Sequence, residues 1–160
     1  MRHYFLDASA FVKLYAVEAG SRRVKDMIRS AASVPATARI VVAGLTHPET
    51  VSGITQIAFG PDAARRGLSP AAVSRTRLEI ADTLGPDATF TVIEPVGIMP
   101  HAAELVWRHR IKASDAVQLA TALYARSVLP GWSEFYFVGS DGRQNSASLA
   151  EGLAVIDPAA

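Results

Sequence analysis

The chain has 160 residues, of which 49% are hydrophobic and 19% are charged, so its composition is that of a globular protein rather than a disordered one. It contains no cysteine, which excludes thiol catalysis, cysteine-ligated zinc and disulfide scaffolds. The formal net charge is only +1, so any contact with nucleic acid must depend on a local basic patch rather than on overall charge.

Five short apolar runs rich in Val, Ile, Phe and Tyr predict β-strands. They cover residues 3–6, 39–43, 90–93, 135–138 and 153–156. Each run is nearly continuous instead of alternating with polar residues, which is typical of strands buried on both faces of a parallel sheet.

Helical patterns fill the intervals between these runs. The expected helices lie at residues 10–17, around 24–31, at 50–59, from Ser69-Pro70 to about residue 84, and at 114–126, with a surface loop at 59–69. The alternation of strands and helices predicts a three-layer α/β/α fold around a central, mostly parallel sheet of four to five strands. The length favours one domain over residues 1–160.

Two aspartates follow predicted strands directly. Asp7 comes after the first strand, and Asp141 comes after the fourth strand and a Gly-Ser pair. Ligands of open α/β sheets bind at the carboxyl ends of the strands, so both carboxylates are candidate site residues. The alternative is that each aspartate only caps a helix or forms a turn.

Two further acids are expected near the same edge of the sheet. Asp115 opens the apolar helix over residues 114–126, where it needs a partner if it is buried. Glu49 lies three residues after Thr46, a spacing that also fits a capping box, with Thr46 as the cap. Carboxylates that converge on one spot repel one another, and a hard divalent cation relieves that repulsion. Oxygen ligands without cysteine or paired histidine favour Mg²⁺ or Mn²⁺, which points to phosphodiester hydrolysis.

The opening segment YFLDASAFVKLYAVEAGS resembles the start of PIN-domain proteins, in particular the VapC-type toxins of bacterial and archaeal toxin–antitoxin pairs. Their pattern there is a strand, Asp-x-Ser, an apolar helix with Lys, and then Glu-x-Gly-Ser. The matching residues are Asp7, Ser9, Lys13, Glu18, Gly20 and Ser21.

Three further motifs follow in the order of that family. PETVSGI resembles the helix that carries the family's glutamate, at Glu49, and SDAVQLATAL resembles the helix that carries its third acid, at Asp115. FVGSDGRQNSASLAEGLAVIDP resembles the closing segment. The matching residues there are Asp141, Asn145, Gly152, Leu153, Asp157 and Pro158. Each motif is weak alone, but the ordered set is specific.

The resemblance implies a PIN-like fold and a metal-dependent endoribonuclease. In such an enzyme, Asp7, Glu49, Asp115 and Asp141 would be the catalytic and metal-binding residues, and water activated by Mg²⁺ or Mn²⁺ would hydrolyse RNA phosphodiester bonds. It also implies a cognate antitoxin that blocks the site and a second copy of the chain in a homodimer. No signal peptide or membrane span is expected, which favours the cytoplasm.

Four other residues are expected to support this site or to bind substrate. Ser9 and Ser140 could orient a neighbouring aspartate, while Lys13 and Asn145 could contact a phosphate. Each has an ordinary structural alternative as a cap, a turn residue or a surface lysine. The run from Trp107 to Lys112 is the densest basic segment, and its charges could hold RNA or form a solvated helix face. Trp107 could stack on a base, but it is expected in the core.

Two other functions fit parts of the sequence. A catalytically weak PIN-fold module could retain antitoxin or RNA binding, because the GLTHP lead-in to Glu49 departs from the family pattern and could shift that glutamate. A receiver or phosphatase domain also places a carboxylate at a strand end. This chain, however, lacks both the Asp-x-Asp of such phosphatases and the acidic pair of receivers.

Overall fold

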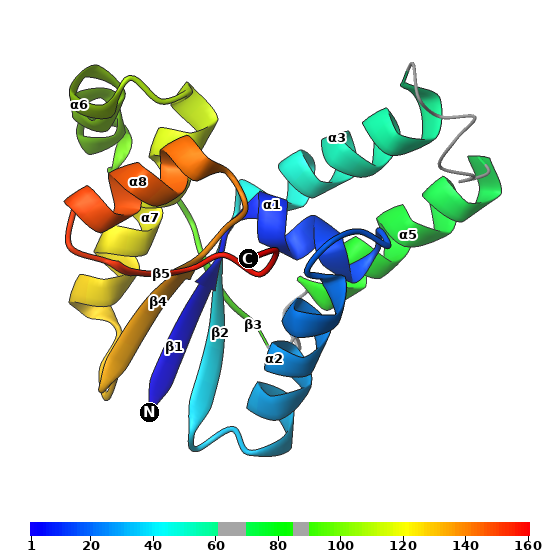
Figure 1. Cartoon of the computed structure of the whole chain (residues 1–160), viewed down its shortest axis with the longest axis horizontal. Coiled ribbons are helices and arrows are strands. Elements are labelled where there is room, and N and C mark those ends of the chain that lie inside the picture. Colours follow the sequence, from blue (N-terminus) through cyan, green and yellow to red (C-terminus); the bar gives the residue numbers. More distant parts are fainter. Residues whose placement is uncertain (61–69, 85–89) are drawn as a thin grey trace.

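The computed structural model describes residues 1–60, 70–84 and 90–160 (Figure 1). Five parallel strands form one sheet in the order β3-β2-β1-β4-β5. They are β1 (Arg2–Leu6), β2 (Ala38–Ala43), β3 (Phe90–Ile93), β4 (Glu134–Val138) and β5 (Ala154–Ile156). All five predicted strands are confirmed, each within one residue of its expected start.

Helices cover both faces of the sheet. The first helix, α1 (Ala8–Phe11), is short and continues into a 3-10 turn (Val12–Leu14). The other helices, in chain order, are α2 (Ser21–Ser33), α3 (Thr46–Phe59), α5 (Pro70–Thr83), α6 (Met99–His109), α7 (Ala113–Val128) and α8 (Gly142–Ala150). One core cluster joins the sheet to α6, α7 and α8, and the other joins it to α1, α2, α3 and α5. The three-layer α/β/α fold is therefore confirmed.

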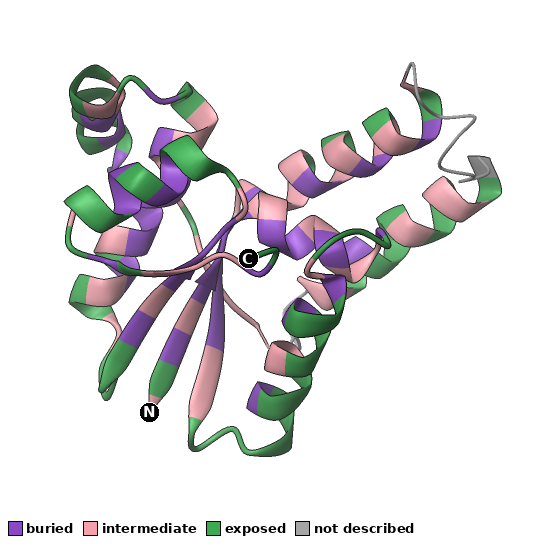
Figure 2. Cartoon of the chain, in the orientation of Figure 1, coloured by how far each residue is buried: buried purple, intermediate pink, exposed green. Residues whose placement is uncertain are grey.

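Burial follows the layers (Figure 2). Three strands, β1, β2 and β4, are buried towards their carboxyl ends. Helix α7 is buried along most of its length, as its nearly all-apolar sequence predicts. Residues 61–69, most of the expected surface loop, lie outside the described residues. None of the helices in the described ranges combines the length and hydrophobicity that a membrane span needs.

The strand order reverses between β1 and β4. From β1 the chain crosses to β2 and β3 on one side, and it later returns to β4 and β5 on the other. In open parallel sheets this reversal separates the loops at the carboxyl ends of the two central strands and leaves a crevice between them. Asp7 and Asp141 follow these two strands, so the topology places both aspartates at the crevice.

The motifs at the two ends of the chain meet in the fold. Gly20 has a φ of +85°, and a Cβ added there would lie 2.6 Å from the carbonyl oxygen of Pro158. Only glycine combines this left-handed backbone with such a close approach. Ser21 follows and donates its hydroxyl to the carbonyl oxygen of Ala16 at 2.8 Å. Gly20, Ser21 and Pro158 therefore serve the structure and not the site.

His3 predicts how the stability of the fold depends on pH. Its imidazole is fully buried beside Phe135, and neither ring nitrogen has a hydrogen-bond partner among the described residues. Burial lowers its pKa from the ordinary value of 6.5. The unfolded chain therefore takes up this proton first as the pH falls, and stability is lost below pH 6.5. We expect His3→Leu to reduce the loss between pH 7 and pH 5 in urea unfolding, and exposed His101→Gln to leave it unchanged.

Candidate active site

Four carboxylates line one cavity at the carboxyl ends of the strands. The cavity has a volume of about 380 Å³ and is lined by Asp7, Glu49, Asp115 and Asp141 together with eight other residues. The other lining residues are Ala8, Ser9, Val12, Ser52, Gly53, Lys112, Ser114 and Gln144. The four acids predicted from the sequence are thus brought together from segments far apart along the chain.

Each acid stands at the beginning of a helix. Asp7 and Asp141 are the N-cap residues of α1 and α8, while Glu49 and Asp115 lie in the first turns of α3 and α7. Because helix N-termini carry partial positive charge, the longer helices help to tolerate negative charge at the cavity. Asp7 and Asp141 therefore cap their helices, as the alternative interpretation predicted, and they also line the cavity.

Glu49 does not form the capping box that its spacing from Thr46 suggests. The helix already begins at Thr46, and Leu45 precedes it without a side-chain cap. Gln118, from α7, instead donates its Nε2 to Glu49 Oε2 at 2.7 Å and to Thr46 Oγ1 at 3.1 Å. The glutamate is thus held towards α7 and the cavity rather than towards its own helix.

A second glutamine holds Asp7. Gln144, in the first turn of α8, is buried and donates its Nε2 to Asp7 Oδ1 at 3.0 Å and to the main-chain oxygen of Asp115 at 3.2 Å. The other Asp7 oxygen accepts the amide of Ser9 at 2.9 Å. Asp141 accepts the amides of Arg143 and Gln144. These donors stabilise the ionised carboxylates.

The acids of the cavity affect one another. Burial raises the pKa of Glu49, the charges of Asp7 and Asp115 raise it further, and the hydrogen bonds from Gln118 and Ser114 oppose the rise. Burial also raises the pKa of Asp115, and Asp7 and Asp141 add to that rise. The cavity therefore holds negative charge that a cation would stabilise.

The donor chemistry of the cavity fits a hard divalent cation. Four carboxylates from four separate elements line the cavity, and their negative charges repel one another. Oxygen atoms of this kind are the ligands that Mg²⁺ and Mn²⁺ prefer. Within the described ranges, however, no three His, Asp or Glu side chains are arranged so that they could hold a metal ion. The compact acidic cluster expected from the sequence is therefore not found among the described residues, although all four acids line the cavity.

All four supporting residues have structural partners. Lys13 is buried, and its ammonium group contacts Glu18 Oε1 at 2.8 Å and the Ala19 oxygen at 2.9 Å, so it does not line the cavity. Asn145 donates to the oxygen of Gly139 at 2.9 Å, and Ser140 faces Asp157. Lys13 is therefore not the surface lysine considered as an alternative, and its ammonium group is paired with Glu18.

Ser9 has a different place from the helix cap considered for it. It lies inside the short helix that Asp7 caps, and the expected helix over residues 10–17 is replaced by α1 and a 3-10 turn. Its Oγ accepts the main-chain amide of Ser140 at 2.9 Å, and Ser9 lines the cavity. Ser9 therefore joins the segments that follow β1 and β4, beside Asp7.

The basic run differs from expectation at Trp107. The side chain is 85% exposed on α6 instead of buried in the core. Lys112, at the end of the same run, precedes α7 and lines the cavity. Its charge and its main-chain amide lower the pKa of Asp115 and oppose the larger upward effect of burial. Lys112 therefore supplies a cation to an otherwise acidic cavity.

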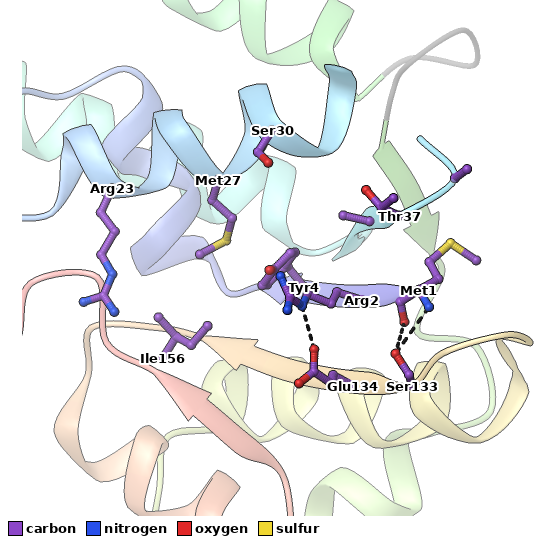
Figure 3. A pocket seen from close by; sticks show the side chains of 12 residues that line it. Met1, Arg2, Tyr4, Arg23, Met27, Ser30, Thr37, Ser133, Glu134 and Ile156 are labelled. Carbon is purple, nitrogen blue, oxygen red and sulfur yellow. Dashed lines mark hydrogen bonds and ion pairs between the residues drawn. The ribbon is translucent and has the colours of Figure 1, made fainter. Parts of the chain in front are cut away.

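A larger hollow of about 640 Å³ is lined by residues of α2 and of four strands, and it reaches the beginnings of β1 and β4 (Figure 3). Met1, Arg2, Ser133 and Glu134 line it, among others. Glu134 is the only acid among its described lining residues, and Arg2 Nε contacts it at 2.6 Å. Because this carboxylate is already paired, the acid-lined cavity is the better candidate for catalysis.

The sequence analysis did not predict three residues of the site, which are Ser114, Gln118 and Gln144. A signal existed for Gln118, because it lies three residues after Asp115 on the same face of an otherwise apolar helix. A glutamine buried in such a helix needs a polar partner. Gln144 lies three residues after Asp141, in the first turn of α8, which carries no comparable signal.

The comparisons with known proteins identify the family of the chain. The family model of the PIN domain matches residues 4–129, and no curated protein matches the chain. Asp7, Glu49 and Asp115 lie within the matched residues, and Asp141 follows them. The match covers more than half of the chain, and its parallel sheet with helices on both faces agrees with that family. The chain therefore belongs to the PIN domain family, whose fold is of the nuclease type.

Proposed function

We propose that this chain is a Mg²⁺- or Mn²⁺-dependent endoribonuclease of the VapC toxin type. The observation that carries the proposal is the convergence of four carboxylates, from four separate elements, on one cavity at the strand order reversal. The family is one of nucleases, and the two raised pKa values indicate a cavity that favours a cation. The resemblance of the four sequence motifs to VapC-type toxins supports RNA as the substrate.

The residues around the cavity have distinct roles in this proposal. Asp7, Glu49, Asp115 and Asp141 would hold the metal, which when bound neutralises phosphate charge and makes a water more acidic. Gln118 and Gln144 hold Glu49 and Asp7 in orientation through their amide groups. Lys112 would attract the substrate phosphate to the rim of the cavity.

An RNA cleavage assay tests the proposed function. We expect the wild-type chain to cleave single-stranded RNA internally with Mg²⁺ or Mn²⁺, and EDTA to stop the reaction because the carboxylates alone supply no electrophile. Asp7→Asn should lose cleavage, whereas Asp26→Asn, a change on the outer face of α2, should retain it. Cleavage that persists in EDTA and in Asp7→Asn would contradict the assignment.

A catalytically weak binding module is the second candidate. It is favoured by one observation, that no three acids among the described residues are arranged to hold a metal ion. A module of this kind would bind RNA or an antitoxin without metal-dependent cleavage. The same assay separates the two candidates, because purified wild-type protein that cleaves only with metal is an enzyme.

The proposal includes two protein partners and a location. The resemblance to VapC-type toxins supports a cognate antitoxin, a second copy of the chain and action in the cytoplasm. An antitoxin that blocks the acid-lined cavity would place a basic group there, because the cavity is acidic. Light scattering of the purified chain, alone and with the antitoxin, measures both assemblies.

A further inference from the structure

Trp107 lies on the outer side of α6. Ala102 and Leu105 are the buried residues of this helix, and Trp107 follows Leu105 by two positions. Two residues correspond to about 200° of helix rotation, which turns the indole away from the core. Its side chain is 85% exposed, although such a large aromatic surface is normally removed from water. The indole is therefore available to a ligand.

Two arginines and a histidine lie around Trp107, together with one acid, Glu104. A hollow of about 760 Å³ is lined by Glu104, Val106, Trp107, Arg108, His109 and Arg110. Arg108 and His109 both contact Glu151 Oε1, each at 2.7 Å, so this acid of the neighbouring segment pairs with the charge of Arg108. Among the described residues, the side chain of Arg110 has no ion-pair partner.

The hollow and the acid-lined cavity are lined by neighbouring parts of the chain. Arg110 ends α6 with a φ of 54°, and after it the chain passes through buried Ile111 to exposed Lys112. Lys112 lines the cavity, and the five steps along the chain from Trp107 to Lys112 span at most about 18 Å. A few nucleotides of extended single strand cover such a distance, since neighbouring phosphates of a strand are several ångströms apart.

We propose that Trp107 is a stacking platform for a base of a single-stranded RNA, and that Arg110 and Lys112 hold the phosphates between this base and the acid-lined cavity. The inference rests on the proposed function and assigns it a substrate-binding surface. Stacking needs an unpaired base, because the faces of paired bases are covered, so the surface would prefer single strands. An exposed aromatic side chain beside an arginine without an ion-pair partner among the described residues is complementary to a base and its phosphates.

RNA binding without cleavage tests this platform. The probe is a 12-nucleotide single-stranded RNA with a fluorescent end label, and its anisotropy is measured with the full chain in EDTA. We expect Trp107→Ala to weaken binding by about 5- to 100-fold, and Trp107→Phe to restore most of the affinity. Phe59→Ala, which removes an exposed aromatic from the far end of α3, is the matched control and should bind as the wild type does.

Two further readouts address the mode of binding. Arg110→Ala and Lys112→Ala should each lower the slope of log Kd against log salt by about one, because each removes one phosphate contact. The chain has two tryptophans, so a Trp132→Phe variant leaves Trp107 as its single indole. Its fluorescence should be quenched by the single strand and much less by a duplex of the same sequence.

The outcomes separate the platform from the proposed function. If the wild type cleaves RNA but Trp107→Ala binds it with unchanged affinity, the platform is wrong and the nuclease assignment stands. If the single strand binds through Trp107 but no metal supports cleavage, the platform stands and the nuclease assignment fails. A Trp107→Ala variant that changes only the oligomeric state, seen by light scattering, would also overturn the platform.

Discussion

Asp115→Asn is expected to lose at least about 100-fold in the rate of RNA cleavage while the fold becomes more stable at neutral pH. The loss follows from the proposed role, because changes that only affect residues behind a metal ligand already cost 10- to 100-fold. The expected gain in stability follows from the burial and the negative charge of the cavity. Burial and the charges of Asp7 and Asp141 raise the pKa of Asp115, so its ionised form is disfavoured in the folded chain.

The pH dependence of this gain has a defined sign. A carboxyl group with a raised pKa in the folded state stabilises the fold below its unfolded pKa of 3.8. This contribution is lost as the pH rises through the folded pKa, and at pH 7 the ionised group destabilises the fold. We therefore expect Asp115→Asn to raise the urea midpoint at pH 7 and to have a smaller effect at pH 4.

Asp26→Asn is the control for both measurements, because Asp26 lies on α2 with exposed arginine partners. It should leave cleavage unchanged and should not raise stability. An Asp115→Asn variant that cleaves RNA as the wild type does would remove Asp115 from the site. A variant that is inactive but less stable than the wild type at pH 7 would contradict the electrostatic account of the cavity.

Gln118→Met is expected to lower cleavage by about 10- to 100-fold at neutral pH. Methionine nearly keeps the shape of the side chain but removes the amide that donates to Glu49 and Thr46. Without that donor the pKa of Glu49, which burial already raises, should rise further. If cleavage needs ionised Glu49, the acidic limb of the pH–rate profile should move to higher pH in this variant.

The same change should also cost about 1–3 kcal/mol of stability, because buried polar groups lose their partner. Gln56→Met, an exposed change on α3, controls for the substitution itself and should affect neither quantity. A Gln118→Met chain that is less stable but keeps the wild-type pH profile would show that Gln118 only supports the fold. The shift of the acidic limb is therefore the decisive readout.

The fold was predictable because its signals are local. Continuous runs such as that at residues 135–138 have few alternatives to a buried parallel strand, and the apolar helix over residues 114–126 differs from the observed α7 (Ala113–Val128) only at its ends. The beginning of α3 was harder to predict. Thr46 and Glu49 have the spacing of a capping box, but the contact with Gln118 on another helix replaces it.

The sequence predicted which acids line the site, but it did not predict how their carboxylates are oriented. Asp7 and Asp141 follow strands whose carboxyl ends must share an edge, which is a consequence of parallel topology alone. The orientation of each carboxylate depends instead on donors from distant segments, as with Gln144 and Asp7, which are 137 positions apart. Trp107 was misplaced for a similar reason, because the rotation of α6 about its axis decides which of its side chains face the core.

Crystals soaked in Mn²⁺ provide the most direct test of the central claim, that these four carboxylates form the binding site of a divalent cation. The account predicts an anomalous difference peak inside the acid-lined cavity, in contact with carboxylate oxygens of Asp7 and at least one of the other three acids. It also predicts that Asp7→Asn crystals lose the peak under the same soak. Wild-type crystals that show no peak in this cavity at saturating Mn²⁺ would contradict the account.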